Sequence, residues 1–459
     1  MFERFSAKGV QFLLGIILAR LLLPEDYGLI GVVFIFIAIS TTITDSGFKS
    51  ALIQKKNRDE KDFSTVFYFN IIAAVLFYCI IFFTAPLIAT FFNNQELISL
   101  IRVSMVSIII NSFSVVQIAK YSIDLDFKTQ TKATLISILI SGSVGIILAY
   151  NGFGVWSLVT QFIIRSSINV TLLCFYSKWI PVDGFHRDRF ISLFSFGSKL
   201  LISSLLESIY RNIYIIIIGK FFPIKELGFY TRARQFSDFP SSNLTQILDR
   251  VTFPILSQIQ DDKQKLTEKY KLLIGNSSLV FFPLMILLLS LSEPLIILVL
   301  TEKWLSVVWM LQLLCLASIW YPIHSLNLNI LKVKGRSDLF LKLEVLKKII
   351  TTIIVIISIP LGIKALLIGH IIVSLISLLL NTYYTQKFID YSLFSQFKDI
   401  ITVLFFNVIM GLIVLFTISF FENNLFKILI GSSSGLLFYV SVTWFFDVGH
   451  IKKIPKYFN

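Results

Sequence analysis

The stretch of sequence that decides the fold of this chain occurs twice. Residues 18–28 read LARLLLPEDYG, and residues 218–228 read IGKFFPIKELG. Each copy has an apolar helix end, a cation, a proline, an acidic residue and a glycine before a new apolar run. Residues 85–88 likewise match 293–296, and residues 151–154 match 361–364. The offsets of 200, 208 and 210 predict a duplicated helical bundle, which in membrane proteins is typical of transporters.

The composition excludes a soluble globular protein. The chain has 459 residues, of which 56% are hydrophobic and 15% charged, and its mean hydropathy is +0.81. Soluble domains carry about 25% charged residues, so these apolar side chains require lipid as their solvent. The net charge of +14 would suit a nucleic-acid-binding protein, but a multi-pass membrane protein gains such a surplus from its cytoplasmic loops. No nucleic-acid partner is therefore expected.

Fourteen apolar segments approach the length of about 20 residues that a membrane helix needs. They cover 5–23, 29–48, 65–91, 98–119, 133–150, 153–176, 191–219, 236–257, 273–300, 305–330, 345–361, 365–384, 400–421 and 425–446. The sequence therefore predicts an all-α integral membrane protein with about 14 transmembrane helices. The loops between the segments are short, so there is no room for a folded catalytic or nucleotide-binding domain.

The repeat predicts how these helices are grouped. Spans 1–6 and 7–12 form two six-helix lobes, and because six is even, both lobes enter the membrane from the same side. We expect an N-terminal lobe at 1–176, a cytoplasmic linker at 177–190 and a C-terminal lobe at 191–387. Two extra helices and a cytoplasmic tail occupy 388–459, outside the duplication.

Loop lysines and arginines predict the orientation, because they accumulate on the cytoplasmic side. With the N-terminus in the cytoplasm, 29 of the 41 fall inside and 9 outside. Arg165, Lys199 and Arg211 lie within or at the edges of spans, and the outer set includes Arg232 and Arg234. This bias places both termini of a multi-pass membrane protein in the cytoplasm.

Motifs for enzymatic chemistry are missing from the sequence. There is no glycine-rich phosphate loop and no dinucleotide-binding fingerprint, and the four histidines have no metal-ligand spacing. We therefore expect a protein that is not an enzyme and has no metal or other cofactor. His324 and His370 fall within spans, where hydrogen-bonded interior histidines are expected ahead of proton-coupling groups.

Cations in or near the apolar segments are the candidate functional residues, because a charge inside a bilayer usually faces a cavity. The candidates are Arg20, Lys49, Arg165, Arg211, Lys220 and Arg250. Arg20 and Lys220 occupy equivalent positions in the two copies of the repeat. Arg165 and Arg211 lie deepest and are the best candidates for lining a cavity. For Lys49, Lys220 and Arg250, the competing interpretation is that the side chains extend to the lipid headgroups.

Carboxylates are scarce in the same segments. An ion-coupled antiporter requires a carboxylate near the middle of the bilayer, and Glu207 is the best candidate. It lies four residues before Arg211, so the two side chains can pair on one helix face. Glu207 could therefore serve ion coupling or only neutralise Arg211. An interior rich in cations and poor in carboxylates favours an anionic substrate over a cationic drug.

Several stretches resemble a known family over nearly the whole chain. They are residues 19–29, 45–48, 150–156, 240–244 and 331–338. In these stretches the chain is similar to the Wzx-type polysaccharide flippases of the multidrug/oligosaccharidyl-lipid/polysaccharide superfamily. The resemblance implies a V-shaped pair of lobes around a central cavity, with functional arginines facing it. Only Arg20, Arg165, Arg211 and Arg250 carry this expectation over to the present chain, and only loosely.

The resemblance also implies an activity. A flippase of this kind moves undecaprenyl-pyrophosphate-linked oligosaccharide repeat units across the bacterial inner membrane by alternating access. The products serve the synthesis of lipopolysaccharide, capsule or exopolysaccharide. The expected partners are the lipid-linked oligosaccharide, the phospholipid bilayer, and polysaccharide polymerase or export machinery. Coupling to a proton or sodium gradient or to the membrane potential stays open at this point.

Physical chemistry agrees with that activity. A pyrophosphate–sugar headgroup is too polar to cross hydrocarbon unaided, and arginine offers paired donors to phosphate oxygens. The alternative is a cation-coupled drug or metabolite antiporter on the same fold. It predicts paired carboxylates inside the membrane, and most of these are missing.

Overall fold

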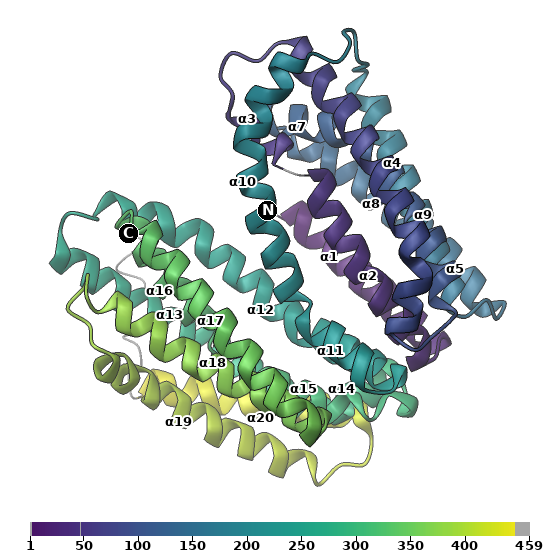
Figure 1. The fold of residues 1–459 in the computed structure, drawn as a ribbon. Helices are drawn as coiled ribbons and strands as arrows, with labels where there is room; N and C mark the ends of the chain where they lie inside the picture. Colours follow the sequence, from purple (N-terminus) through teal and green to yellow (C-terminus); the bar gives the residue numbers. More distant parts are fainter. Residues whose placement is uncertain (1, 46, 446–459) are drawn as a thin grey trace. The chain divides into compact units, whose positions relative to one another are not determined.

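The computed structural model describes residues 2–45 and 47–445, and every regular element in these ranges is helical (Figure 1). The predicted all-α class is confirmed. The end of the expected cytoplasmic tail, residues 446–459, lies outside the described residues. So does Ser46, one of the residues that carried the family resemblance.

The chain divides into two compact units, residues 1–231 and 232–459. The boundary falls inside a single helix, α12 (Ile224–Gln258). The first unit therefore holds spans 1–7 and the beginning of helix α12, and the second unit holds the rest. The lobe limits that the repeat suggests, 1–176 and 191–387, stay a prediction.

The first unit is built from eleven helices and the start of α12. They are α1 (Phe2–Leu21), α2 (Pro24–Asp45), α3 (Phe48–Gln54), α4 (Glu60–Phe91), α5 (Leu97–Ser104), α6 (Val106–Ser112), α7 (Val115–Ile123), α8 (Phe127–Tyr150), α9 (Val155–Ser177), α10 (Arg187–Arg211) and α11 (Ile213–Phe221). Helices α8 and α9 form a hairpin, and α1 packs on α8. The turn between α8 and α9 uses Gly152 and Gly154 at positive φ, 80° and 51°, a conformation that glycine adopts at little cost.

The second unit contains the remaining helices. They are α13 (Lys263–Ser290), α14 (Ser292–Leu300), η1 (Glu302–Trp304), α15 (Val307–Ser318), α16 (Tyr321–Val333), α17 (Ser337–Ser358), η2 (Ile359–Leu361), α18 (Ile363–Thr385), α19 (Leu393–Ile418) and α20 (Asn424–Phe445). The two helices outside the duplication, α19 and α20, pack on α13 and α14. A Cβ on Gly435 of α20 would lie 2.6 Å from Val414 of α19, so small residues let these helices approach closely.

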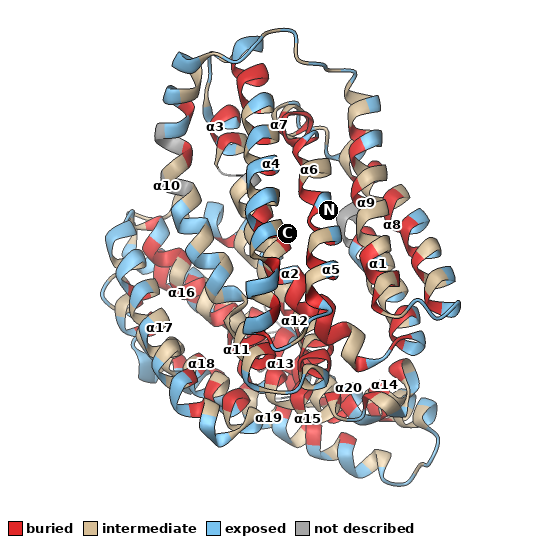
Figure 2. Cartoon of the chain, turned by 45° about the vertical axis from the view of Figure 1, so that its right-hand side comes forward, coloured by how far each residue is buried: buried red, intermediate tan, exposed pale blue. Residues whose placement is uncertain are grey.

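Lipid-facing surface is visible along α4. Ile72, Leu76, Ile80, Phe83 and Leu87 are each more than half exposed, from 54% to 75%. Their spacing of three or four residues puts them on one face of the helix, and exposed positions recur along α4 in Figure 2. Such an exposed apolar face fits a hydrocarbon solvent and not water.

The number of spans is only partly tested by the helices themselves. In the described residues, nine helices are long and apolar enough to cross a membrane, or eleven if two bent pairs each form one span. The other expected spans are α1, α12 and α17. Helix α12 departs most clearly from the apolar pattern because it carries Lys225, Glu226, Arg232, Arg234, Asp238, Asp249 and Arg250. Fourteen spans therefore stay a prediction.

The two copies of the repeated stretch meet inside the first unit. A Cβ on Gly28 would lie 2.0 Å from the backbone oxygen of Ile224, and a Cβ on Gly228 would lie 1.8 Å from that of Pro24. Each glycine therefore makes room for the backbone of the other copy. The Lys225 ammonium adds an ion pair with Glu25 at 3.7 Å. We name the contact made by these six residues the repeat contact; Gly31 extends it, beside Thr231.

Candidate functional site

Arg165 is a cation inside one of the apolar helices of the first unit, α9. It lies ten residues after the start of α9 (Val155–Ser177), which is about 15 Å along the helix at 1.5 Å per residue. A hydrocarbon core is about 30 Å thick, so Arg165 is near its middle. Within the described part of the chain, Arg165 makes no hydrogen bond or ion pair. The side chains next to it are polar, since Asn111 Nδ2 of α6 donates to Ser166 Oγ over 3.4 Å.

Arg211 and Glu207 form the ion pair that their spacing predicts. Both side chains are 64% exposed on α10, so neither is neutralised in a closed interior. Arg211 ends α10, and the chain bends by 47° where α11 begins. The pairing is confirmed, while the role of either residue in transport stays a prediction.

The other predicted cations are spread over several helices. Arg20 is exposed in the last turn of α1, Lys49 is half-buried in α3, and Arg250 is exposed on α12. Lys220 donates to the backbone oxygen of Phe91 over 2.6 Å and lies 4.7 Å from the ring of Phe91. It also lines a pocket of about 340 Å³ with Asn93 and Asn94. Lys220 therefore caps the end of α4 in this structure.

Two further arginines lie in a helix where the sequence predicted a loop. Arg232 and Arg234 were counted with the outer loops, but α12 begins at Ile224. Arg234 lies ten residues, or about 15 Å, from the start of this helix, and the side of the membrane on which the two arginines lie stays a prediction. The stretch was misread because its charges suggested a loop. The sequence does contain a signal for the helix, because no glycine or proline that could end it occurs between Gly228 and Pro240.

These two arginines belong to a polar face of α12. Arg234 Nε donates to Asp238 Oδ2 over 3.2 Å, one helical turn away. Arg232 is 8% exposed and donates to Gln235 Oε1. The charges of Arg234 and Asp238 act on Tyr321 of α16, and the charge of Arg234 acts on His370 of α18. The second unit thus gathers ionisable side chains from three helices.

A second polar contact joins α12 to α16. Asp249 Oδ1 accepts hydrogen bonds from Ser325 Oγ and from Asn329 Nδ2, the latter at 3.0 Å. Asn329 Nδ2 also lies 3.1 Å from Thr252 Oγ1. Asp249 is therefore used to hold two helices together.

His324 has the environment that was expected of an interior histidine. Its Nε2 lies 3.3 Å from Ser374 Oγ, and its Nδ1 lies 3.4 Å from Asn381 Nδ2. Both ring nitrogens have partners on α18, so this interpretation is confirmed for His324. In the described residues, no group of three or more His, Cys, Asp or Glu side chains could hold a metal ion.

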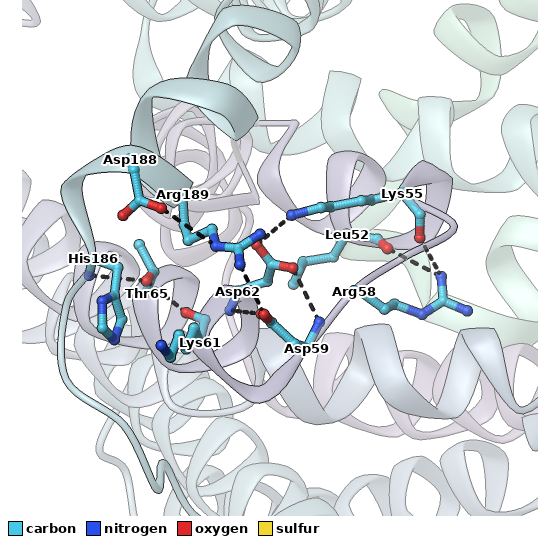
Figure 3. Close-up of polar contacts among 10 residues, drawn as sticks. All are labelled: Leu52, Lys55, Arg58, Asp59, Lys61, Asp62, Thr65, His186, Asp188 and Arg189. Atoms are coloured by element: carbon cyan, nitrogen blue, oxygen red, sulfur yellow. Dashed lines mark hydrogen bonds and ion pairs between the residues drawn. The ribbon is translucent and has the colours of Figure 1, made fainter.

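A third polar cluster lies at the start of α4 and is drawn in Figure 3. Asp62 is fully buried and pairs with Lys55 Nζ at 2.6 Å. Asp59 and Asp62 form a reciprocal capping box at the N-terminus of α4, which satisfies two otherwise open backbone donors. Arg189 of α10 reaches the carboxylate of Asp59 at 3.0 Å. We call these four residues the α4 cluster.

Residues of α4 next to this cluster also fix the linker between α9 and α10. The backbone N–H of Asp183 donates to Ser64 Oγ over 3.3 Å, and that of His186 donates to Thr65 Oγ1 over 3.1 Å. Trp179 Nε1 donates to Glu60 Oε2 over 2.7 Å. Burial opposes ionisation of Asp59, but the backbone N–H of Asp62 and the charge of Arg189 hold its pKa below the usual value. The linker is thus part of the first unit.

The comparison with protein families gives a direct match. The family model described as "Polysaccharide biosynthesis protein" matches residues 17–309. The teichuronic acid biosynthesis protein TuaB of Bacillus subtilis (strain 168) is 32% identical over 308 residues, which is 65% of this chain and 62% of TuaB. The lipopolysaccharide biosynthesis protein WzxC of Escherichia coli (strain K12) is 24% identical over 392 residues, 83% of this chain and 78% of WzxC. The match thus covers less than two thirds of TuaB.

Solved structures show the same fold. The lipid II flippase MurJ in an inward closed conformation aligns with a TM-score of 0.80 and 17% identity, over 96% of this chain and 98% of MurJ. An inward-facing multidrug resistance transporter of the MATE family aligns with a TM-score of 0.67 and 15% identity, over 82% of this chain and 94% of that chain. At these identities the likeness concerns the fold alone.

Proposed function

Because the chain belongs to the polysaccharide biosynthesis protein family, we propose that it is a flippase that carries lipid-linked oligosaccharide repeat units across the bacterial inner membrane. The carrier lipid would be undecaprenyl pyrophosphate, and the product would serve a surface polysaccharide. Two relatives whose printed names concern teichuronic acid and lipopolysaccharide biosynthesis support this proposal. A fold shared with a lipid II flippase supports it as well.

Arg165 is the observation that carries the proposal. A guanidinium stays charged when it is buried, and an intramembrane charge without a counter-ion is costly. Arg165 is near mid-membrane and has no acidic partner among the described residues. A pyrophosphate diester headgroup would supply that partner, because its oxygens match the paired donors of arginine. We assign Arg165 the role of binding the headgroup during its passage.

The membrane potential could supply much of the driving force. Moving a charge through 100 mV changes its free energy by about 2.3 kcal/mol, so two negative charges leaving an inside-negative cell gain roughly 4–5 kcal/mol. This gain makes ATP hydrolysis unnecessary for export. We propose that the cytoplasmic side holds the linker and both termini, as the loop charges indicate, and that polymerase or export machinery takes over the product.

Reconstitution tests the function directly. The full chain is placed in vesicles with a fluorescent lipid-linked oligosaccharide, and quenching from outside reports how much has crossed. We expect the wild-type protein to speed crossing over empty vesicles and Arg165→Ala to abolish most of the gain. Arg165→Lys should restore only part of it, since the charge returns without the paired donors. A wild-type rate equal to that of empty vesicles would reject the flippase.

A cation-coupled drug or metabolite antiporter is the second candidate, and Asp238 is the observation in its favour. It is a carboxylate within α12 that was not among the candidates from the sequence. Its pairing with Arg234 weighs against a cation site, because the carboxylate is already neutralised. Efflux of a cationic dye from the same vesicles would distinguish this candidate from the flippase.

A further inference from the structure

The first unit has a pocket of about 340 Å³ where α4 ends and α12 begins. Two turns line it, the one after α4 and the one after α11. The lining combines aromatic and polar side chains, among them Phe92, Phe221, Phe222, Asn93, Asn94 and Lys220. Pockets for small molecules measure about 300–1,000 Å³ and combine apolar walls with a few polar groups. In both respects this pocket suits a ligand of one or two rings.

The walls of the pocket are held by contacts within the first unit. A Cβ on Gly219 would lie 3.1 Å from Cε1 of Phe92, so the glycine lets the ring pack against α11. The next residue, Lys220, donates from Nζ to the backbone oxygen of Phe91 over 2.6 Å. Two neighbouring residues of α11 thus hold the end of α4, and the pocket exists before any ligand enters it.

The polar groups of the pocket offer both donors and acceptors. Asn93 has a positive φ of 55°, a conformation that asparagine tolerates better than most residues. Asn94 Oδ1 accepts a hydrogen bond from the backbone N–H of Glu96 over 3.0 Å, and its amide nitrogen is a donor. An ammonium has three donors, of which Lys220 uses one on Phe91. Among the described residues that line the pocket, Lys220 carries the only charge.

A sugar ring matches this combination of groups. Hydroxyls surround its edge and C–H groups cover its faces, so it requires hydrogen-bonding amides and apolar rings side by side. The asparagines supply the amides, and Phe221, which is 55% exposed, supplies an apolar ring. A carboxylate on the sugar would neutralise Lys220. A phosphate ion would use the lysine but leave the aromatic lining without a role, so an acidic sugar is the better match.

Helix α4 separates this pocket from the linker (Figure 1). It has 32 residues and is therefore roughly 48 Å long at 1.5 Å per residue, more than the hydrocarbon core of about 30 Å. The α4 cluster and the linker lie at its start, and the pocket lies at its end. With the linker in the cytoplasm, as the loop charges predict, the pocket faces the outer side.

We propose that this pocket binds an acidic sugar, a pyranose ring that carries a carboxylate. Lys220 binds the carboxylate, and the amides of Asn93 and Asn94 bind hydroxyls. The assignment of this sugar to the transported glycan rests on the proposed function. In that case the pocket holds one sugar of the repeat unit on the side to which the product is delivered.

The test measures sugar binding to the purified full-length chain by saturation-transfer NMR. The probes are methyl glucuronide and methyl glucoside, which differ in the carboxylate. In the wild type, we expect the glucuronide to bind about two- to fivefold more tightly, since a partly exposed ion pair is weak. Lys220→Gln should remove this preference. Lys220→Arg keeps the charge and should keep the preference, even where the glutamine variant fails to fold.

Three further variants separate the roles of the lining residues. Asn93→Gly keeps the backbone conformation, because glycine adopts positive φ at little cost, and should weaken the binding of both sugars. Asn94→Asp keeps the acceptor for the Glu96 N–H but adds a negative charge, so it should weaken the glucuronide more than the glucoside. Lys364→Gln removes an exposed lysine of the second unit and should change neither.

Inorganic phosphate, added at constant ionic strength, is the competing anion. We expect it not to displace the glucuronide. Displacement by phosphate together with no binding of the glucoside would reveal a simple anion site and overturn the proposal. Equal binding of both sugars by the wild type, or an unchanged preference in Lys220→Gln, would overturn it as well.

Failure here and failure of the proposed function give different results. Wild-type protein that transports the lipid-linked oligosaccharide in vesicles but binds neither sugar would reject the pocket and keep the flippase. Binding of the glucuronide through Lys220 by a protein that transports no lipid-linked substrate would keep the pocket and reject the flippase.

Discussion

Arginine side chains in this molecule differ in what neutralises them. Arg165 has no acidic partner among the described residues, Arg234 pairs with Asp238 inside α12, and Arg211 pairs with Glu207 on an exposed face. Ion pairs between exposed side chains contribute little to stability. Arg165, which lies deep in an apolar helix without an acidic partner among the described residues, is therefore the strongest candidate for contact with an anionic substrate.

Glu207 and Arg211 give a residue-scale prediction. If Arg211 binds the headgroup, Arg211→Ala lowers transport and the double change Glu207→Ala with Arg211→Ala does not restore it. If Arg211 only neutralises Glu207, the double variant regains the activity that either single variant loses. Because both side chains are 64% exposed, we expect no rescue and wild-type expression of all three variants. The measurement is transport in vesicles, normalised to the amount of inserted protein.

The charged positions show what single residues could predict. The i, i+4 pairing of Glu207 and Arg211 follows from helix geometry alone, and the structure contains it. The helical conformation at Arg234 did not follow, because a loop and a polar helix have the same composition. The only local evidence for a helix was that no glycine or proline interrupts the stretch between Gly228 and Pro240, and the charge pattern outweighed it.

At the scale of elements, the linker from 178 to 186 depends on α4. Its backbone donates to Ser64 and Thr65, and Arg189 anchors the start of α10 on Asp59. Helix α10 also passes close to α3, since a Cβ on Gly47 would lie 2.6 Å from the Gly197 oxygen. Sequence alone identified the linker. Its attachment to α4 could not be predicted, because it depends on tertiary contacts that a periodic pattern of hydrophobic residues does not reveal.

Loss of the Asp59 carboxylate should loosen this linker. We expect Asp59→Asn to speed hydrogen exchange at the amides of Asp183 and His186 at neutral pH by several-fold. Lys263→Ala, which breaks the Lys263–Asp390 pair of the second unit, serves as the matched control and should not affect these amides. Unchanged exchange in Asp59→Asn would show that the backbone contacts hold the linker without help from Arg189.

The same cluster predicts a response to acid. The pKa of Asp59 is lower in the folded protein than in the unfolded chain, where the pKa of an aspartate is about 3.9. Its stabilising contribution is therefore complete above that value and is lost as pH falls through the lower folded pKa. Linker protection, corrected for intrinsic exchange rates, should stay constant from neutral pH down to about 4 and then fall. In Asp59→Asn this acid step should be missing.

At the scale of the whole molecule, the membrane topology follows from the distribution of charge. We expect both termini and the linker on the cytoplasmic side, since cations accumulate there. In a variant without native cysteines, Gly184→Cys should react with an impermeant thiol reagent only from the cytoplasm. Asn423→Cys, between α19 and α20, should react only from the opposite side. The reverse labelling pattern would contradict the assigned orientation.

The all-helical membrane class could be predicted from the sequence because hydropathy and helix length act over 20-residue windows that need no tertiary information. The limits of the two compact units, which divide between 231 and 232, could not, because they depend on which helices pack together. The lobe limits that the repeat suggests, 1–176 and 191–387, are a separate grouping and stay a prediction. In sequence, span 7 belongs to the second copy of the duplication. In its contacts, it belongs with the α4 cluster of the first unit, through Arg189 of α10.

The repeat contact also limits how this chain could have changed since its duplication. Gly28 leaves room for the backbone of the second copy, and Gly228 leaves room for the backbone of the first. A side chain added in either copy meets main chain in the other, and main chain cannot be trimmed by a compensating substitution. A substitution at either glycine is therefore limited by the opposite copy of the repeat, so each copy restricts the sequence of the other at this contact.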